Sequence, residues 1–281
     1  MRLELASLPD APLLTSPNVR HLSANPGQLG ISGCFLQTAP LFVTSGLDSL
    51  RVFDVSDGPR PELVGTLPSV QFENEAMNCG ERRTRQGTER FALIGVDLYQ
   101  ASPDDIQHSN VDGGELIVVD VTDPTAPRIR SRVPGTTSTH KVACVAETDC
   151  TYAYSAGEGD SFSIFDLRDL DSPQEVDADP AAPGVQPFTS PTAGHKWNFD
   201  AAGVGTHTGF GGSSMWDVSV PQRPELLTTT GAAGAGTDPA NPGYNDFIHP
   251  QLLPPQRRGV PAGRAAVPGQ RQRAAGDRGG L

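Results

Sequence analysis

Short apolar runs, most of them rich in β-branched or aromatic residues, alternate with turn-forming residues along most of the chain. Four of these runs share one pattern, because each ends in an aspartate that is followed by a proline seven residues later. The four aspartates are Asp54, Asp120, Asp166 and Asp217. Such apolar runs favour strands, whereas Asp opens turns and Pro stops strand pairing. Each copy therefore predicts a strand, a structural turn at the aspartate, and an end to pairing at the proline.

Further strand candidates surround each of these runs. In three copies a second strand-like run follows the proline, at 62–65, 128–130 and 225–227. A turn with glycine lies upstream of each aspartate, and another strand candidate precedes the turn, as at 91–96 and 151–155. Each repeat thus holds about four short antiparallel strands. The aspartates are spaced by 66 (54 to 120), 46 (120 to 166) and 51 (166 to 217) residues, which is typical of β-propeller blades when one blade carries an insertion, here at 98–112.

The repeated strings resemble a known repeat. The sequence Leu-Ile-Val-Val-Asp at 116–120, together with the Asp-Val-Thr-Asp-Pro that overlaps it at 120–124, is similar to the LVIVD repeat of bacterial and archaeal proteins. Over roughly residues 18–249 the resemblance implies an all-β propeller of four-stranded antiparallel blades, from a family whose members are often secreted or held at the cell surface. It implies no particular activity. The fourth copy departs from the pattern, with Val220 in place of the second aspartate.

Three regions are expected from this pattern. Residues 1–17 form an N-terminal lead-in, and residues 18–250 form blades at about 18–70, 71–135, 136–190 and 191–240, with a partial fifth blade from 244. Residues 251–281 form an Arg/Pro/Gly-rich tail with six arginines and one acidic residue, which predicts disorder. A fifth repeat begins but its pattern is lost in this tail. Our hypothesis is therefore a reading-frame shift near His249 that truncates the propeller.

Charge and composition narrow the classes of function and location. The formal net charge is −12 and the chain contains only two lysines, which argues against nucleic acid as a partner. No apolar run is long enough to span a membrane. The first residues lack the features of a secretory signal, so an extracellular or cell-envelope location is expected from the resemblance and the cysteines rather than from an export signal.

The cysteines offer one disulfide candidate. Cys144 and Cys150 flank a turn between two predicted strands, and a hairpin would bring them to a distance that a disulfide can span. The alternative is a pair of buried thiols. A bridge between blades from Cys34 to Cys79 is a weaker possibility. Any bridge would indicate an oxidising compartment.

Histidines recur at one point of the repeat. His140, His195 and His249 precede the expected first strands of their blades, and Glu75 lies at the corresponding point of the second blade. First strands line the channel of a propeller, so these residues could converge on a divalent transition metal such as copper, zinc or iron. Alternatively, the histidines bond backbone carbonyls between blades. Calcium bound by the aspartates is a lesser alternative, since turn capping explains those residues more simply.

Two functions from different classes follow. The first is a binding or interaction scaffold that presents its blades to a protein, a polysaccharide or a small ligand, with no enzyme activity. The second is a metal-dependent oxidoreductase or hydrolase whose site is built from His140, His195, His249 and Glu75. The two tryptophans are expected to be core residues, and the proline-rich segment 177–192 is expected to be a surface linker.

Overall fold

Four antiparallel sheets of four strands each make up most of the described chain. The computed structural model describes residue 18 and residues 30–46, 48–68, 77–96, 114–157, 160–192, 194–209 and 212–229. The remaining ordered pieces within these ranges are a two-stranded sheet and a 3₁₀ turn at Glu147–Asp149. The all-β fold class expected from the sequence is confirmed. The lead-in at 1–17, the partial fifth blade from 244 and the tail at 251–281 lie outside the described residues.

The strands of each sheet follow one another in chain order. The first sheet contains β1 (Gly30–Phe35), β2 (Leu41–Gly46), β3 (Ser49–Asp54) and β4 (Glu62–Pro68). The second contains β5 (Met77–Thr84), β6 (Gly87–Val96), β7 (Gly114–Asp120) and β8 (Arg128–Gly135). All neighbouring strands within these two sheets are antiparallel. This up-and-down order is that of a propeller blade.

The other two blades have the same order, with one addition. The third contains β9 (Lys141–Cys144), β10 (Tyr152–Ala156), β12 (Ile164–Asp166) and β13 (Gln174–Glu175). The fourth contains β15 (Lys196–Phe199), β16 (Val204–Gly209), β17 (Gly212–Asp217) and β18 (Glu225–Thr229). Between them, β11 (Ser161–Phe162) pairs with β14 (Phe188–Thr189).

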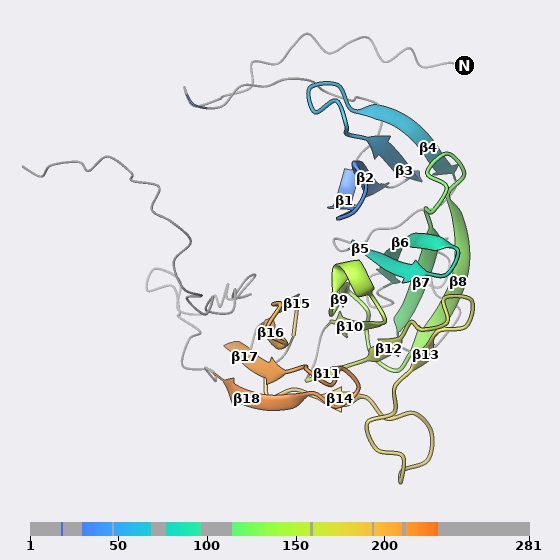
Figure 1. The fold of residues 1–281 in the computed structure, drawn as a ribbon. Coiled ribbons are helices and arrows are strands. Elements are labelled where there is room, and N and C mark those ends of the chain that lie inside the picture. The colour runs from blue at the N-terminus through green and yellow to red at the C-terminus, as the bar shows by residue number, and fades with distance from the viewer. Residues whose placement is uncertain are drawn as a thin grey trace, which may run out of the picture.

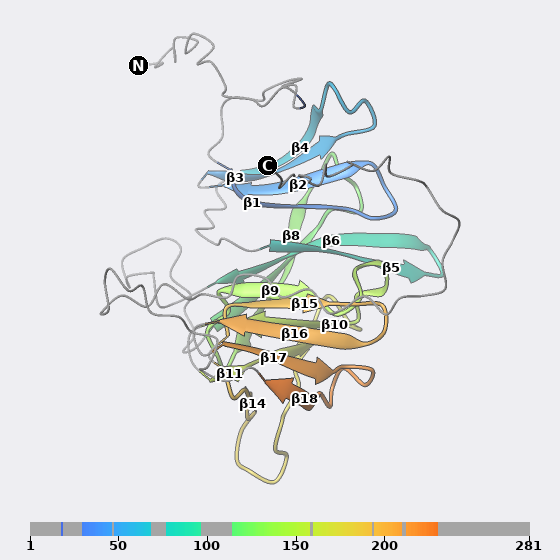
Figure 2. The same ribbon diagram turned by 90° about the vertical axis from the view of Figure 1, so that its left-hand side faces the viewer.

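The four sheets are arranged as consecutive blades around a common axis. Figure 1 shows them along an arc, with β1, β5, β9 and β15 on its concave side and the outer strands β4, β8 and β18 on its convex side. In the view turned by 90°, the first sheet lies above the second, and the third and fourth sheets lie below them and overlap in this view (Figure 2). The first strand of each blade therefore faces the centre, as the propeller prediction requires.

The repeated aspartate forms the same turn in every blade. Its carboxylate accepts a hydrogen bond from the backbone N–H two residues later, which is the geometry of an Asx turn. The donors are Ser56 for Asp54 (2.7 Å), Thr122 for Asp120 (2.9 Å), Arg168 for Asp166 (3.0 Å) and Ser219 for Asp217 (2.9 Å). The outer strand then begins directly after the proline in all four blades. The repeat in the sequence is thus a repeat of local hydrogen bonding.

The cores lie between neighbouring blades. Alternate residues of a strand point to opposite faces, so a strand buried on both faces serves two cores. On β6, Ala92 and Ile94 pack toward the first blade, whereas Phe91 and Leu93 pack toward the third. The third and fourth blades share an aromatic core that includes Tyr154, Phe162, Trp197 and Trp216, and both tryptophans are buried as expected.

One glycine marks how closely two blades approach. A Cβ placed on Gly65 in β4 would lie 1.9 Å from the backbone oxygen of Pro124, which belongs to the turn of the next blade. No side chain fits at that distance. Glycine at this position therefore allows the outer strand of the first blade to contact the second.

The segment 177–192 is more than a surface linker. Its residues Phe188 and Thr189 form β14, and Ser190 and Thr192 are buried, 5% and 1% exposed respectively. The proline content suggested only an exposed connection. Proline disfavours strand pairing, but its frequency does not indicate which side chains of a segment are buried. The structure shows that the end of this segment packs between the third and fourth blades.

Candidate ligand-binding site

A cavity of about 790 Å³ lies on the concave side of the arc. Its walls include residues of β1, β5, β9 and β15, so every described blade contributes its first strand. Consecutive residues of β9 and β15 line the cavity, and the alternation of side chains along β9 also lets Val142 and Cys144 pack toward the second blade while Ala143 packs toward the fourth. A hollow lined by several blades is a common place for a ligand to bind in a barrel-like or propeller-like β fold.

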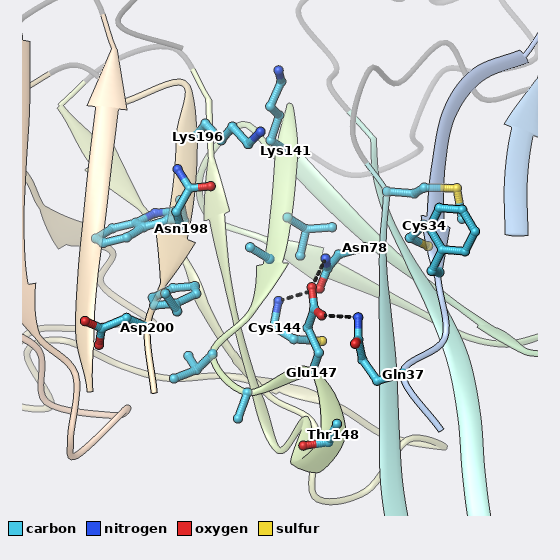
Figure 3. Close-up of a pocket in the computed structure, with 18 of the residues that line it drawn as sticks. Cys34, Gln37, Asn78, Lys141, Cys144, Glu147, Thr148, Lys196, Asn198 and Asp200 are labelled. Carbon is cyan, nitrogen blue, oxygen red and sulfur yellow. Dashed lines mark hydrogen bonds between the residues drawn. The ribbon is translucent and has the colours of Figure 1, made fainter. Parts of the chain in front are cut away.

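Both lysines of the chain are at one end of this cavity. Lys141 is the first residue of β9 and Lys196 is the first residue of β15, and both side chains line the cavity. Figure 3 shows the two side chains at the same end of the site, with the Lys196 side chain extended toward Lys141. Neighbouring blades thus place two positive charges in equivalent positions.

A histidine precedes each lysine, and the two histidines meet. The ring centroids of His140 and His195 are 4.9 Å apart, with the ring planes inclined by 46°. The backbone N–H of His195 donates to the carbonyl of Thr208 at 2.6 Å, which fixes the start of β15 against β16. The two His-Lys pairs of the sequence are therefore brought together where β9 and β15 begin.

Carboxylates lie toward the opposite end. Glu147 accepts hydrogen bonds from the side-chain amides of Gln37, at 2.8 Å, and Asn78, at 3.2 Å. The Asn78 oxygen in turn accepts from the backbone N–H of Cys144 at 2.9 Å. These bonds connect the first three blades across the cavity wall (Figure 3). On the fourth blade, Asp200 accepts from the backbone N–H groups of Ala202 and Val204, both at 2.9 Å. Both carboxylates thus have structural partners.

The wall on the fourth blade combines an aromatic core with one polar group that lacks a partner. Trp197 is 3% exposed, and its indole N–H donates to the carbonyl of Ser155 at 2.8 Å. Asn198 follows it and lines the cavity between Lys196 and Asp200. Its Nδ2 is buried and has no hydrogen-bond partner among the described residues. A buried amide without a partner is unusual, and here it belongs to a side chain at the cavity.

A fully buried histidine supports this wall from behind. The His207 ring stacks on the Trp197 ring, with centroids 4.3 Å apart and planes inclined by 9°. Its Nδ1 lies 3.0 Å from the Ser190 hydroxyl. Burial lowers the pKa of His207 from 6.5 to about 3, so the imidazole is neutral at ordinary pH. Nothing in the sequence marks His207 as part of a site, because it is a lone histidine inside a strand that carries no other motif.

Two disulfides lie next to the cavity. Cys144 and Cys150 are joined across the 3₁₀ turn, with Cα atoms 5.4 Å apart, which is the pairing that the hairpin argument favours. Cys34 of β1 and Cys79 of β5 are also joined, with Cα atoms 5.6 Å apart, so the weaker of the two suggested bridges is present as well. The second bridge ties the first blade to the second. Cys34 and Cys144 both line the cavity.

The four residues suggested as metal ligands are only partly described. His140 and His195 are adjacent, whereas His249 and Glu75 lie outside the described residues. Within the described ranges, no group of three or more His, Cys, Asp or Glu side chains is placed to hold a metal ion. The lysine pair was not identified as a site from the sequence, although aligning the third and fourth repeats on their His-Lys dipeptides would have found it.

Comparisons with known proteins support the fold. No family model matches the chain, and no curated protein matches it. Among solved structures, it is similar to the periplasmic gluconolactonase PpgL of Pseudomonas aeruginosa, with a TM-score of 0.55 and 11% identity over 77% of this chain and 61% of that one. A Lactobacillus plantarum protein has a TM-score of 0.48 and 11% identity over 70% of this chain and 54% of its own. Sqt1 of Saccharomyces cerevisiae has a TM-score of 0.44 and 13% identity, over 73% and 48%.

The similarity to PpgL bears on architecture. The chain spans about three fifths of the length of that enzyme, and identity is too low to carry an activity across. Within the part of the chain that the structure describes, no helix is long and apolar enough to cross a membrane. The sheets, their order and the similarity to PpgL together show a β-propeller fold.

Proposed function

We propose that this chain is an LVIVD-type β-propeller of an exported or cell-surface protein that binds a small ligand in its central cavity. The observation that supports this function best is the cavity of about 790 Å³ lined by the first strands of all four described blades. Its volume is within the range of small-molecule sites, and its lining combines apolar and polar side chains in similar measure. The repeat pattern and its recurring aspartate turn support the family assignment.

The disulfides support the proposed location. All four cysteines of the chain are paired. Disulfides persist in the periplasm and outside the cell, whereas they are rare in a reducing cytoplasm. An extracellular or envelope location therefore fits the chemistry of the chain.

Blocking the cavity tests the binding function. Ala143 lines the cavity from β9, so Ala143→Phe should fill part of it, whereas Thr66→Phe adds the same side chain on an exposed part of β4 and serves as the control. Calorimetric titration of the folded variants with a panel of sugars, sugar acids and amino acids should show binding that is lost in Ala143→Phe and kept in Thr66→Phe. Binding that is unchanged in Ala143→Phe, or no binding by any member of the panel, would count against this function.

The second candidate is a metal-dependent oxidoreductase or hydrolase. The contact between the His140 and His195 rings favours it, because two imidazoles at one point are the beginning of a transition-metal site. His249 and Glu75 would complete the proposed set. Elemental analysis of the purified protein should then find a stoichiometric transition metal that is lost in His140→Ala and in His195→Ala. Metal that survives both substitutions would exclude this site, and the binding function requires none.

A further inference from the structure

The distribution of lysine in this chain is unusual. The chain carries a formal net charge of −12 and has two lysines in 281 residues. Both are at the same end of one cavity, each at the first position of an inner strand and each directly after a histidine. Lysines that serve only to keep a surface hydrated have no reason to gather at one site. The placement of both lysines at one end of one cavity therefore suggests a role in that cavity.

The surroundings of Lys196 favour a negatively charged group. Among the described residues, no carboxylate forms an ion pair with the Lys196 ammonium. The two carboxylates of the cavity, Glu147 and Asp200, lie toward its other end and already accept hydrogen bonds from the protein. Among the described residues that line the cavity, the two lysines thus lie at one end and the two carboxylates toward the other. An anion would be repelled from the carboxylate end and attracted to Lys196.

We infer that the lysine end of the cavity binds an oxyanion, the carboxylate or phosphate group of a small ligand, between Lys141 and Lys196. This inference rests on the proposed binding function and adds the chemical class and orientation of the ligand. Ammonium groups form strong, charge-assisted hydrogen bonds to such oxygens. The rest of the ligand would then extend along β15, past the aromatic wall.

Asn198 fits the same arrangement. It follows Lys196 by two residues on β15, so the two side chains project from the same face of the strand. Its amide has a nitrogen without a partner among the described residues, and its side chain lines the cavity beside the lysine end. An amide supplies both a donor and an acceptor, and it would suit a hydroxyl group next to the oxyanion.

The low lysine content makes a direct test possible. Reductive methylation with ¹³C-formaldehyde labels Lys141, Lys196 and the N-terminal amine and keeps their charges. Carbon-proton NMR spectra then contain few signals, and Lys141→Gln and Lys196→Gln assign them. The labelled protein is titrated at constant ionic strength with inorganic phosphate, with glucuronate and with glucose, which resembles glucuronate but lacks its carboxylate.

The inference predicts saturable shifts of both lysine signals with glucuronate or with phosphate, and none with glucose. A response to both compounds indicates a site for oxyanions in general. A response to glucuronate alone indicates that the site binds a carboxylate, and a response to phosphate alone indicates that it binds a phosphate group. In unlabelled protein, Lys196→Gln should weaken binding about tenfold, the effect of one lost charge-assisted bond. Arg60→Gln removes an exposed positive charge on the turn between β3 and β4 and should leave the affinity unchanged.

The remaining outcomes separate this inference from the binding function. If glucose, or a neutral compound from the panel, binds and Ala143→Phe abolishes that binding while both lysine variants retain it, the cavity binds a ligand but the oxyanion inference is wrong. If neither anion moves the lysine signals and no compound binds the cavity, both proposals fail. Equal losses of affinity in Lys196→Gln and Arg60→Gln would show a general charge effect and would also overturn the inference.

Discussion

At the scale of single residues, the aromatic core of the fourth blade depends on a histidine that stays neutral. His207 is fully buried between Trp197, Phe162 and Ser190. A Cβ on Gly194 would overlap its ring, at 1.5 Å from Nε2, so the backbone of the blade closes directly over the imidazole. A protonated ring would have to keep its charge in this enclosed site, where no carboxylate among the described residues is hydrogen-bonded to it.

The stability of the protein should therefore fall as His207 becomes protonated in the unfolded chain. Its pKa is about 3 in the folded state and 6.5 in the unfolded state, so between these values the unfolded chain binds the extra proton. The free energy of unfolding should decrease by up to about 1.4 kcal/mol per pH unit as the pH falls below 6.5. Urea denaturation between pH 6.5 and 5, above the range of most carboxylates, measures this slope.

His207→Gln provides the comparison, because glutamine is polar but does not titrate. The variant should be less stable at neutral pH, since it disturbs a packed core, but its stability should depend less on pH over the same window. The difference between the two slopes should approach about 1.4 kcal/mol per pH unit, which corresponds to one proton bound by the unfolded chain. Equal slopes in the two proteins would show that His207 does not control the acid sensitivity.

At the scale of strands and turns, the repeated aspartate ends one strand and begins the return to the next. Asp120 shows the full arrangement, because one carboxylate oxygen accepts from the backbone N–H of Thr122 and the other accepts from Arg128 at the start of β8, at 2.8 Å. The turn and the outer strand of the second blade are therefore held by the same side chain.

Two substitutions of Asp120 should distinguish the contribution of the turn hydrogen bond to stability from that of the ion pair. Asp120→Ala loses both interactions, and we expect it to lower the free energy of unfolding by about 1 to 2 kcal/mol. Asp120→Asn keeps an oxygen for the Thr122 N–H and loses mainly the exposed ion pair, so about 0.5 kcal/mol is expected. Chemical denaturation of both variants provides the values. Equal losses in the two variants would assign the effect to the charge and not to the turn.

The same elements show which features of the structure the sequence could predict. The spacing from Asp to Pro predicted the strands and turns because both are set by local hydrogen bonding, which recurs from Asp54 to Asp217. The pairing of Cys34 with Cys79 depends on how two blades meet, and nothing local specifies that distance. The lysine end of the cavity depends on how β9 and β15 of neighbouring blades lie next to each other. The His-Lys dipeptides of the third and fourth repeats were a signal for it in the sequence, but the structure was needed to show that the two side chains line one cavity.

At the scale of the whole molecule, the two disulfides cross-link different parts of the fold. The bridge from Cys34 to Cys79 joins two blades and encloses a chain segment of 45 residues, whereas the bridge from Cys144 to Cys150 spans only 6 residues inside one blade. In the chain-entropy account, a longer closed loop removes more freedom from the unfolded state. The expected contributions are about 4 kcal/mol for the first and about 2 kcal/mol for the second.

The double variants Cys34→Ala/Cys79→Ala and Cys144→Ala/Cys150→Ala test this order. The first should lose about 2 kcal/mol more free energy of unfolding than the second in denaturation experiments under oxidising conditions. It should also expose the first blade to limited proteolysis before the others, since β1 and β5 would then be joined only by packing and by hydrogen bonds such as that from the Met77 N–H to the Ser32 hydroxyl, at 3.1 Å. If the short bridge contributes as much as the long one, native-state packing around the 3₁₀ turn, and not chain entropy, dominates the effect. If the first blade keeps its resistance to proteolysis, the apolar core between the first two blades is sufficient to hold them together.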